Sequence, residues 1–492
     1  MQLRDYQKKL VSGIASAFSQ GAKSPVAVAP TGSGKTAVMA HIAKGAASKG
    51  NSCGILAHRQ ELITQTSLAL ARAGVWHSVI APDSVIRECF KIHVEELGRS
   101  FYNADAPSHV ASVQTLTRRL KTGAAPDPFR LLFIDECHHA VAGQWAQVIE
   151  AMPDAKILGV TATPERLDGR GLGITSGGPF DHMVQGPTVD ELISLGFLSR
   201  PKIYSPPSEI DVSKFRTEKG DYKRQDADAA VDKASITGDV IDHYRRLANG
   251  IPSIAFCVSV NHAQHVAEQF TAAGFRAACV DGTMSDAERR RAIRALGEGR
   301  LHVLTSCDIV SEGTDIPIVG AAILLRPTKS LGLYLQQVGR VLRPYQGKEY
   351  SIILDHVGNA LQHGLPEESR DWSLDGRKKK TRGERDAAGP SVTTCFECYA
   401  TFSPTLDACP MCGAAVEKSQ RKLEQREGDL VEVDEAALQA HRRREQGMAQ
   451  TYDDLVAMGR RKGYKSPESW ARHIIATRQR KKAPIVRAPG VE

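Results

Sequence analysis

The stretch of sequence that decides the fold is Ala29-Pro30-Thr31-Gly32-Ser33-Gly34-Lys35-Thr36. It follows a short apolar run and precedes a helix-like segment. Glycines at such a junction let the backbone wrap around phosphate groups, to which the amides and the helix N-terminus offer positive potential. In such a loop Lys35 reaches the β- and γ-phosphates, Thr36 binds Mg²⁺, and Thr31 to Gly34 line the nucleotide. We therefore predict a site for ATP and Mg²⁺. Ala29 replaces the usual first glycine, and an ordinary glycine turn is the alternative.

A second stretch, Leu131-Leu132-Phe133-Ile134-Asp135-Glu136-Cys137-His138, supplies an acidic partner. Four apolar residues that end in two carboxylates are typical of a buried strand with its acids at the carboxyl end. There Asp135 can hold Mg²⁺ through water, and Glu136 can orient and deprotonate an attacking water. A strand end with two solvated acids is the alternative. Paired with Lys35, these acids favour hydrolysis of the bound nucleotide.

Short apolar runs alternate with longer helix-like stretches along both halves of the chain. We expect ten strands: Val26–Ala29, Cys53–Ala57, His109–Val113, Leu131–Asp135, Ile157–Val160, Ser253–Val258, Ala277–Val280, His302–Thr305, Ala321–Leu325 and Ser351–Leu354. Continuous apolar strands separated by helices indicate parallel sheets that are covered on both faces. The fold class is therefore α/β, with two doubly wound domains over residues 1–198 and 199–365.

Composition excludes several classes of protein. No apolar run approaches the roughly 18 residues of a membrane span, and the N-terminus lacks the apolar centre of a signal peptide. Six of the ten cysteines are scattered, and four cluster near residue 400, which is unlike a disulfide scaffold. This usage is typical of the reducing cytosol, so we expect a cytoplasmic protein without a membrane partner.

Six further segments stand near predicted strand ends. They are Leu3–Gln7, Ala57–Leu62, Ser112–Leu116, Thr161–Pro164, Ser311–Pro317 and Gln336–Arg343. In this order, with Asp135-Glu136-Cys137-His138, they resemble the motifs of the DExH-box branch of superfamily 2 helicases and translocases. The resemblance covers roughly residues 1 to 365. Three other segments resemble the bacterial and phage members grouped with XPB-like and restriction-motor helicases. These are Thr163–Gly169, Leu325–Ser330 and Ile353–His356.

The resemblance implies two RecA-like domains with ATP in the cleft between them. Arg4 and Gln7 match the adenine-sensing segment, in which Gln7 reads the edge of the base. Motif six would contribute three residues across the cleft, with its arginines as fingers: Gln336, Arg340 and Arg343. Motif five would contribute Gly313 and Asp315, although Thr314 stands where the group commonly has an aromatic residue.

The resemblance also implies a nucleic-acid path. It places Arg59, Gln114 and Thr115 on the first domain, and Gly282 and Thr305 on the second, along a phosphate backbone. Backbone contacts predict weak sequence preference and steep salt dependence. The alternative for Arg59 and Gln114 is that each satisfies hydrogen bonds within its own loop.

We therefore expect an ATP-dependent helicase or translocase that acts on DNA or RNA, with DNA favoured. One alternative is a translocase that moves on duplex DNA without unwinding it, as a subunit of a restriction or repair complex. Another is an ATP-switched nucleic-acid-binding scaffold. Partner proteins from repair, replication or restriction complexes are expected.

After Gly364 the composition changes. Residues 366–390 are charged and poor in apolar side chains, which is typical of a linker. Residues 391–416 hold two Cys-x-x-Cys pairs with ten residues between them: Cys395, Cys398, Cys409 and Cys412. Two such turns can close a tetrahedral, structural Zn²⁺ site. An iron–sulfur cluster or redox-active pairs are the alternatives.

Residues 417–492 are predicted to be helical and basic. Between Ala436 and Glu492 there are thirteen Lys or Arg and five Asp or Glu, a difference of +8 that equals the net charge of the whole chain. With Tyr464 and Trp470 interleaved as stacking surfaces, this segment is expected to contact nucleic acid. A solvated helical face is the alternative.

Overall fold

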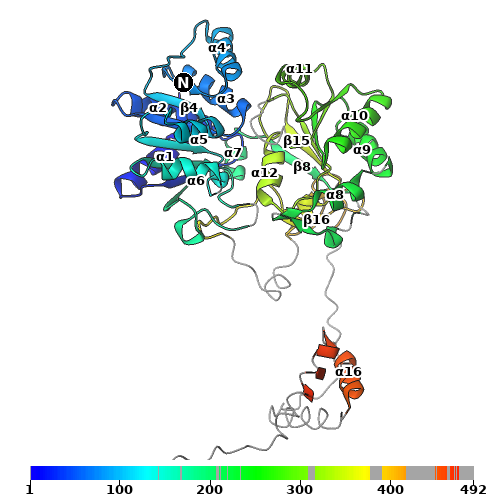
Figure 1. The fold of residues 1–492 in the computed structure, drawn as a ribbon. Coiled ribbons are helices and arrows are strands. Elements are labelled where there is room, and N and C mark those ends of the chain that lie inside the picture. Colours follow the sequence, from blue (N-terminus) through cyan, green and yellow to red (C-terminus); the bar gives the residue numbers. More distant parts are fainter. Residues whose placement is uncertain are drawn as a thin grey trace, which may run out of the picture. The chain divides into compact units, whose positions relative to one another are not determined.

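The chain divides into two compact units, residues 1–418 and residues 419–492. The computed structural model describes residues 2–141, 143–166, 169–206, 210, 212–218, 220–232, 234–308, 316–376, 391–416, 449, 451–461, 466–469, 471–472 and 474–475. The first unit contains two large, mainly parallel sheets, each with its own layers of helices (Figure 1).

The first sheet has seven parallel strands in the order β3-β4-β2-β5-β6-β1-β7. Its strands are β1 (Pro25–Val28), β2 (Cys53–Ala57), β3 (Ser78–Ile80), β4 (Ser108–Ser112), β5 (Leu131–Asp135), β6 (Lys156–Thr161) and β7 (His182–Gln185). Its helices are α1 (Asp5–Ser19), α2 (Lys35–Ala47), α3 (Gln60–Arg72), α4 (Asp83–Leu97), α5 (Val113–Thr122) and α6 (Gln144–Glu150). The strand β1 lies between β6 and β7, so the loop after β1 opens beside the end of β6.

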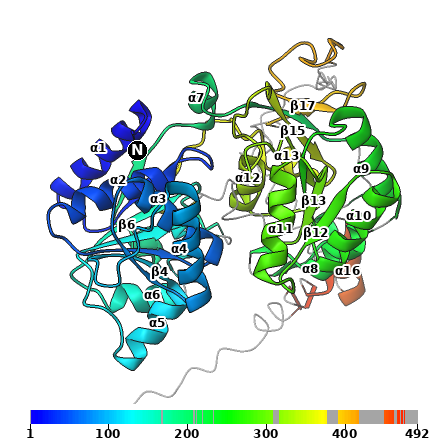
Figure 2. The ribbon, with the colours of Figure 1, turned by 90° about the horizontal axis from the view of Figure 1, so that it is seen from above.

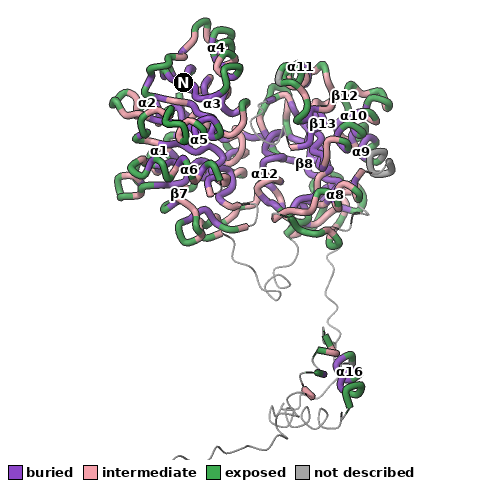
Figure 3. Tube along the Cα trace, viewed as in Figure 1, coloured by how far each residue is buried: buried purple, intermediate pink, exposed green. Residues whose placement is uncertain are grey.

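Alternate residues of these strands face opposite layers. On one face Ala27 and Ile55 pack with side chains of α1 to α4, and on the other face Val26 and Leu56 pack with α5 and α6. Both faces are thus covered, as the continuous apolar strands predict. Figure 3 shows the buried residues running along these central elements.

The second sheet has eight strands in the order β12-β13-β11-β14-β15-β8-β17-β16. Its strands are β8 (Arg200–Tyr204), β11 (Ser253–Phe256), β12 (Ala277–Val280), β13 (Val303–Ser306), β14 (Ala321–Leu324), β15 (Tyr350–Asp355), β16 (Thr393–Thr394) and β17 (Ala400–Phe402). Its helices are α8 (Arg224–Val231), α9 (Ala234–Leu247), α10 (Val260–Ala272), α11 (Asp286–Gly297), α12 (Leu331–Gly339) and α13 (Asn359–His363). A small hairpin, β9 (Thr217–Glu218) and β10 (Asp221–Tyr222), precedes α8. The strands from β12 to β8 are parallel, and β17 pairs antiparallel to β8.

Helices cover both faces of this sheet as well. Side chains of α9 and α10 form one layer, and side chains of α8, α11 and α12 form the other. The connection between the domains includes α7 (Val189–Ser194), which Figure 2 shows between the two sheets. Leu192 and Leu198 of this connection already belong to the core of the second domain. The tandem doubly wound α/β architecture predicted from the sequence is confirmed.

After α13 the chain returns to the first domain, and we call residues 366–376 the strap. Leu374 packs against the core beneath α5 and α6, and its carbonyl accepts a hydrogen bond from the Gly173 amide at 2.8 Å. Gly376 forms a β-bridge with Arg170. The part of the predicted linker that lies in the strap is therefore an ordered crossing between the domains, and residues 377–390 lie outside the described residues.

In the second unit the structure describes α16 (Tyr452–Arg461) and a few residues near it. Leu455, Val456 and Met458 pack with Ala471 in a small core. Tyr464, Trp470 and most of the predicted basic contact lie outside the described residues. None of the helices in the described part of the chain combines the length and the apolar character needed to cross a lipid bilayer.

The strap gives a test of the fold. A Cβ atom on Gly171 would lie 1.7 Å from the Leu374 carbonyl oxygen, so Gly171→Ala should displace the strap from the first domain. We expect faster hydrogen exchange in peptides that cover residues 366–376. Gly45→Ala is the matched control, because a Cβ at this position in α2 meets nothing within 4 Å. Equal exchange of the strap in the two variants would contradict the crossing.

Candidate functional site

The loop after β1 adopts the conformation that its glycines permit. Gly32 and Gly34 have φ of 86° and 81°, and Gly34 is the N-cap of α2. Both angles lie in the left-handed region that favours glycine. Lys35 is the first residue of α2 and donates hydrogen bonds from Nζ to the carbonyls of Ala29 and Pro30, at 3.3 and 3.4 Å. Its ammonium therefore sits over the mouth of the loop.

The start of α1 holds this loop from the other side. The Gln7 Nε2 atom and the Tyr6 hydroxyl both donate to the Ser33 carbonyl, at 3.0 and 2.9 Å. A Cβ atom on Gly34 would lie 2.4 Å from Gln7 Nε2, so a larger residue here would displace the Gln7 side chain in addition to straining φ. The Arg4 guanidinium stacks 4.0 Å over the Phe197 ring. The segment predicted to sense adenine thus holds the loop directly, a contact that the sequence did not predict.

The two acids at the end of β5 lie close to the lysine. Glu136 Oε1 is 4.0 Å from Lys35 Nζ, and both side chains are almost fully buried. Glu136 has φ of 47°, in the left-handed region that residues other than glycine rarely adopt. Asp135 Oδ1 accepts the Glu136 amide at 3.0 Å, and His138 Nδ1 lies 3.4 Å from Glu136 Oε2. Lys35, Asp135 and Glu136 therefore form one cluster, and Thr36 follows in the first turn of α2.

Helix α12 of the second domain approaches the same loop. A Cβ atom on Gly339 would lie 2.6 Å from the Thr31 Cβ, so the Thr31 side chain packs directly against the Gly339 backbone. The Arg343 Cγ atom lies 3.7 Å from the position that a Gly32 Cβ would occupy. Burial lowers the pKa of Arg343 to about 10. Gln336 and Arg340 are also buried, with 4% and 9% of their surfaces exposed.

Two side chains of the loop fit an absent phosphate group. Thr31 Oγ1 and Ser33 Oγ are buried and have no hydrogen-bond partner within the described part of the chain. Buried hydroxyl groups are normally hydrogen-bonded. Phosphate oxygens or metal-bound water at the mouth of the loop would satisfy them, so the donor set fits a Mg²⁺–nucleotide.

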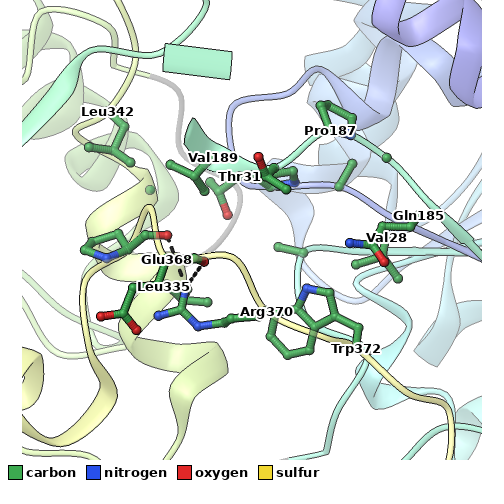
Figure 4. Close-up of a pocket in the computed structure, with 17 residues that line it drawn as sticks. Val28, Thr31, Gln185, Pro187, Val189, Leu335, Leu342, Glu368, Arg370 and Trp372 are labelled. Carbon is green, nitrogen blue, oxygen red and sulfur yellow. Dashed lines mark hydrogen bonds between the residues drawn. The ribbon is translucent and has the colours of Figure 1, made fainter. Parts of the chain in front are cut away.

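A pocket lies beside the loop at the junction of the domains (Figure 4). Val28 and Thr31 line one side, and Leu335 and Leu342 line another. The strap closes the pocket with Glu368, Arg370 and Trp372. Arg370 donates to the carbonyls of Pro366 and Glu368, at 3.2 and 2.9 Å, which fixes the bend of the strap.

On the first domain, the residues predicted to contact a nucleic-acid strand make contacts within the protein. Arg59 is the N-cap of α3, and its Nη1 donates to the Asp308 carbonyl of the second domain at 2.9 Å. Gln114 Nε2 donates to the His58 carbonyl at 3.2 Å, while Thr115 is buried in the first turn of α5. Arg59 thus contacts the second domain, and Gln114 contacts the loop that carries Arg59.

On the second domain, the residues predicted to contact a strand are Thr305 and Gly282. Thr305 is fully buried in β13, and its hydroxyl donates to the Ala263 carbonyl at 2.6 Å, so its side chain has no access to a strand. The Thr305 side chain is thus engaged inside the sheet, and the placement of the segment around Thr305 along a phosphate backbone stays a prediction. Gly282 is exposed in the loop after β12, with open space around it. Gly313 and Asp315 lie outside the described residues.

The four clustered cysteines converge. Their Sγ atoms all lie within 4.8 Å of one another, and the Cys395–Cys412 and Cys398–Cys409 pairs are each 3.6 Å apart. A tetrahedral Zn²⁺ with Zn–S bonds of about 2.3 Å requires sulfur atoms about 3.8 Å apart. All ten cysteines of the chain are free thiols, so neither pair is a disulfide. The cluster can hold one tetrahedral metal ion.

Comparison with known proteins gives two matching families. Residues 1–166 match the family described as type III restriction enzyme, res subunit, and residues 233–345 match the helicase conserved C-terminal domain. A 51.5 kDa protein of a Lactococcus phage is 35% identical over 414 residues, which cover 83% of this chain and 82% of that protein.

More distant relatives include a helicase and a restriction-enzyme subunit. The putative ATP-dependent helicase IRC3 of Saccharomyces cerevisiae is 29% identical over 72% of this chain, and this chain spans about half (51%) of the yeast protein. Among solved structures, a fragment of a putative HsdR subunit of a type I restriction enzyme from Vibrio vulnificus matches with a TM-score of 0.56 at 21% identity. The matched region covers 76% of this chain and 67% of that fragment.

Proposed function

We propose that this chain, which belongs to the superfamily 2 helicases related to restriction-enzyme motors, couples ATP hydrolysis to movement along nucleic acid, with DNA favoured over RNA. The observation that carries the proposal is the composite site, in which Lys35 and Glu136 of one domain lie 4.0 Å apart and Arg343 of the other domain rests on the same loop.

Each group has a place in the reaction. The amides of the loop and the Lys35 ammonium bind the β- and γ-phosphates. Thr36 and Asp135 would hold Mg²⁺, which supplies charge neutralisation at the phosphates when bound. Glu136 takes a proton from the attacking water, held by its buried position beside Lys35. The ion pair with Lys35 keeps this carboxylate close to the γ-phosphate.

The second domain completes the site only when the cleft is closed. Gln336, Arg340 and Arg343 lie on or after α12, whose Gly339 touches Thr31. Arginine side chains that reach the γ-phosphate stabilise the charge that develops during transfer. Loss of the γ-phosphate removes that attraction, so the cleft opens after hydrolysis. This alternation would drive stepping along a strand. We place Gly313 and Asp315 at the same cleft.

The nucleic-acid path shares residues with the contact between the domains. Arg59 binds the Asp308 carbonyl, and Glu61 pairs with Arg289 at 2.7 Å. A strand that binds Arg59, Gln114, Thr115 and Gly282 would therefore compete with or reinforce these contacts. Binding of the phosphate backbone would in this way be coupled to closure of the cleft.

A translocase that does not unwind is the second candidate, and the likeness to restriction-enzyme subunits favours it. We infer that partner proteins of a restriction, repair or replication complex would supply specificity in that case. Displacement of a triplex strand without displacement of a duplex strand would identify this activity. We further propose a cytoplasmic location, since all ten cysteines are free thiols.

The proposal is tested by ATP hydrolysis with a panel of single-stranded and duplex DNA and RNA. The wild type should be stimulated by at least one member, most strongly by DNA. Lys35→Ala should abolish turnover. Glu136→Gln should retain ATP binding and lose about 10²- to 10⁴-fold in rate. Lys23→Ala, an exposed lysine on the same domain, is the control. Normal turnover in Lys35→Ala or Glu136→Gln would contradict the assignment.

We also propose that Cys395, Cys398, Cys409 and Cys412 bind structural Zn²⁺. Because β17 joins this module to the edge of the second sheet, the metal would stabilise that edge. Elemental analysis should find about one zinc and no iron per chain. Cys398→Ser should lose the metal, whereas Cys279→Ser, the control in β12, should retain it. Iron, or a chain without metal, would exclude the zinc assignment.

A further inference from the structure

The turn after α12 carries Arg340 to Arg343 and is held by a lysine that the sequence did not single out. The Lys348 Nζ atom donates to the carbonyls of Arg343, Val319 and Val341, the first two at 2.7 and 2.8 Å. An ammonium group has three N–H donors, so these three carbonyls satisfy it completely. Lys348 therefore ties the turn to the loop that contains Val319.

Neighbouring groups complete the restraint on the turn. The Ser199 amide and hydroxyl both donate to the Leu342 carbonyl, at 2.7 and 3.1 Å. The Ser351 hydroxyl donates to the Val341 carbonyl. The three successive carbonyls from Val341 to Arg343 are thus all held, and only Lys348 holds two of them. Removing it releases the carbonyl of Arg343 itself.

The position of Arg343 follows from this turn. Its Cγ atom lies 3.7 Å from the position of a Gly32 Cβ, so a small backbone shift moves the guanidinium relative to the phosphate-binding loop. Burial and the neighbouring Arg343 guanidinium lower the pKa of Lys348 to about 7, so the ammonium form with its three donors predominates below pH 7. Placing two cations together in a buried region is unfavourable. Such a local cost is expected at functional sites more than in a structural turn.

We propose that Lys348 is a positioning residue that sets the place of Arg343, and with it Arg340, at the γ-phosphate. Lys348 does not touch ATP. Its clamp on the carbonyls fixes the backbone from which the arginines extend. Val319 lies just after Pro317, the end of motif five, so the same clamp keeps motif six in register with motif five. This inference rests on the proposed function.

The test compares Lys348→Met with the wild type at saturating nucleic acid. Methionine keeps much of the stem and removes the charge and all three donors. We expect kcat to fall about 10- to 100-fold, the loss that small misplacements of catalytic groups cause, while the Kd for a non-hydrolysable ATP analogue changes less than about twofold. Lys348→Arg restores charged donors and should recover part of kcat.

Two further variants show whether the effect passes through Arg343. Lys348→Met should add little to the loss caused by Arg343→Ala, because both remove the same interaction. Tyr244→Phe is the control for a lost buried hydrogen bond in the same domain, since its hydroxyl donates to the Ile251 carbonyl and not to a carbonyl of the turn. It should leave kcat near the wild-type value.

Every outcome decides between the hypotheses. Unchanged kcat in folded Lys348→Met, or a full additional loss in the double variant, would overturn the positioning role. If Lys348→Met does not fold, Ser351→Ala can replace it, because it removes another hydrogen bond to the same turn. Ser351→Ala should lower kcat with unchanged ATP affinity. An unchanged kcat in Ser351→Ala would also overturn the positioning role. A wild type without ATP hydrolysis would refute the proposed function instead, and the inference with it.

Discussion

The close approach of Gly339 to Thr31 is the contact on which the site depends. A Cβ atom on Gly339 would lie 2.6 Å from the Thr31 Cβ, so only glycine lets α12 reach the phosphate-binding loop. The helix ends at that residue, and Arg340 and Arg343 follow at once. The loop is held from the first domain by Tyr6 and Gln7 through the Ser33 carbonyl. The short segment from Thr31 to Ser33 is therefore in contact with both domains.

Other contacts between the domains involve the strap and two polar pairs. The strap crosses back to the first domain, where Gly173 binds the Leu374 carbonyl, and it lines the pocket beside the loop. Away from the strap, Arg289 pairs with Glu61, and Arg59 binds the Asp308 carbonyl. The latter two contacts involve the segments expected to follow a nucleic-acid backbone. Short polar contacts thus connect those segments to the second domain.

Much of the fold follows from the sequence, because buried parallel strands are continuous apolar runs. All ten expected strands are present, and the phosphate-binding loop and the acids of β5 meet as predicted. The strands β3, β7 and β8 were missed, and so were the short strands β9, β10, β16 and β17. Short or mixed runs such as His182–Gln185 are stabilised by pairing with a neighbour, which local composition does not report. The strap was missed for the same reason, since its charged composition is typical of a linker and Leu374 finds its place only in the folded core.

The site could be predicted where a motif fixes the local backbone conformation. It was harder to predict where tertiary contacts determine the surroundings of a side chain. Gly32 and Gly34 have the predicted conformation, whereas Thr305 turned out to satisfy the Ala263 carbonyl inside the sheet. No sequence pattern marks Lys348, because its three acceptors come from residues brought together by folding.

If the second domain completes the ATP site, Arg340→Ala should impair hydrolysis. The measurement is the single-turnover rate of ATP hydrolysis with nucleic acid present, together with the ATP affinity of the same protein. We expect a loss of roughly 10³-fold in rate with nearly unchanged affinity, as for removal of an arginine finger. A rate close to that of the wild type would contradict the composite site.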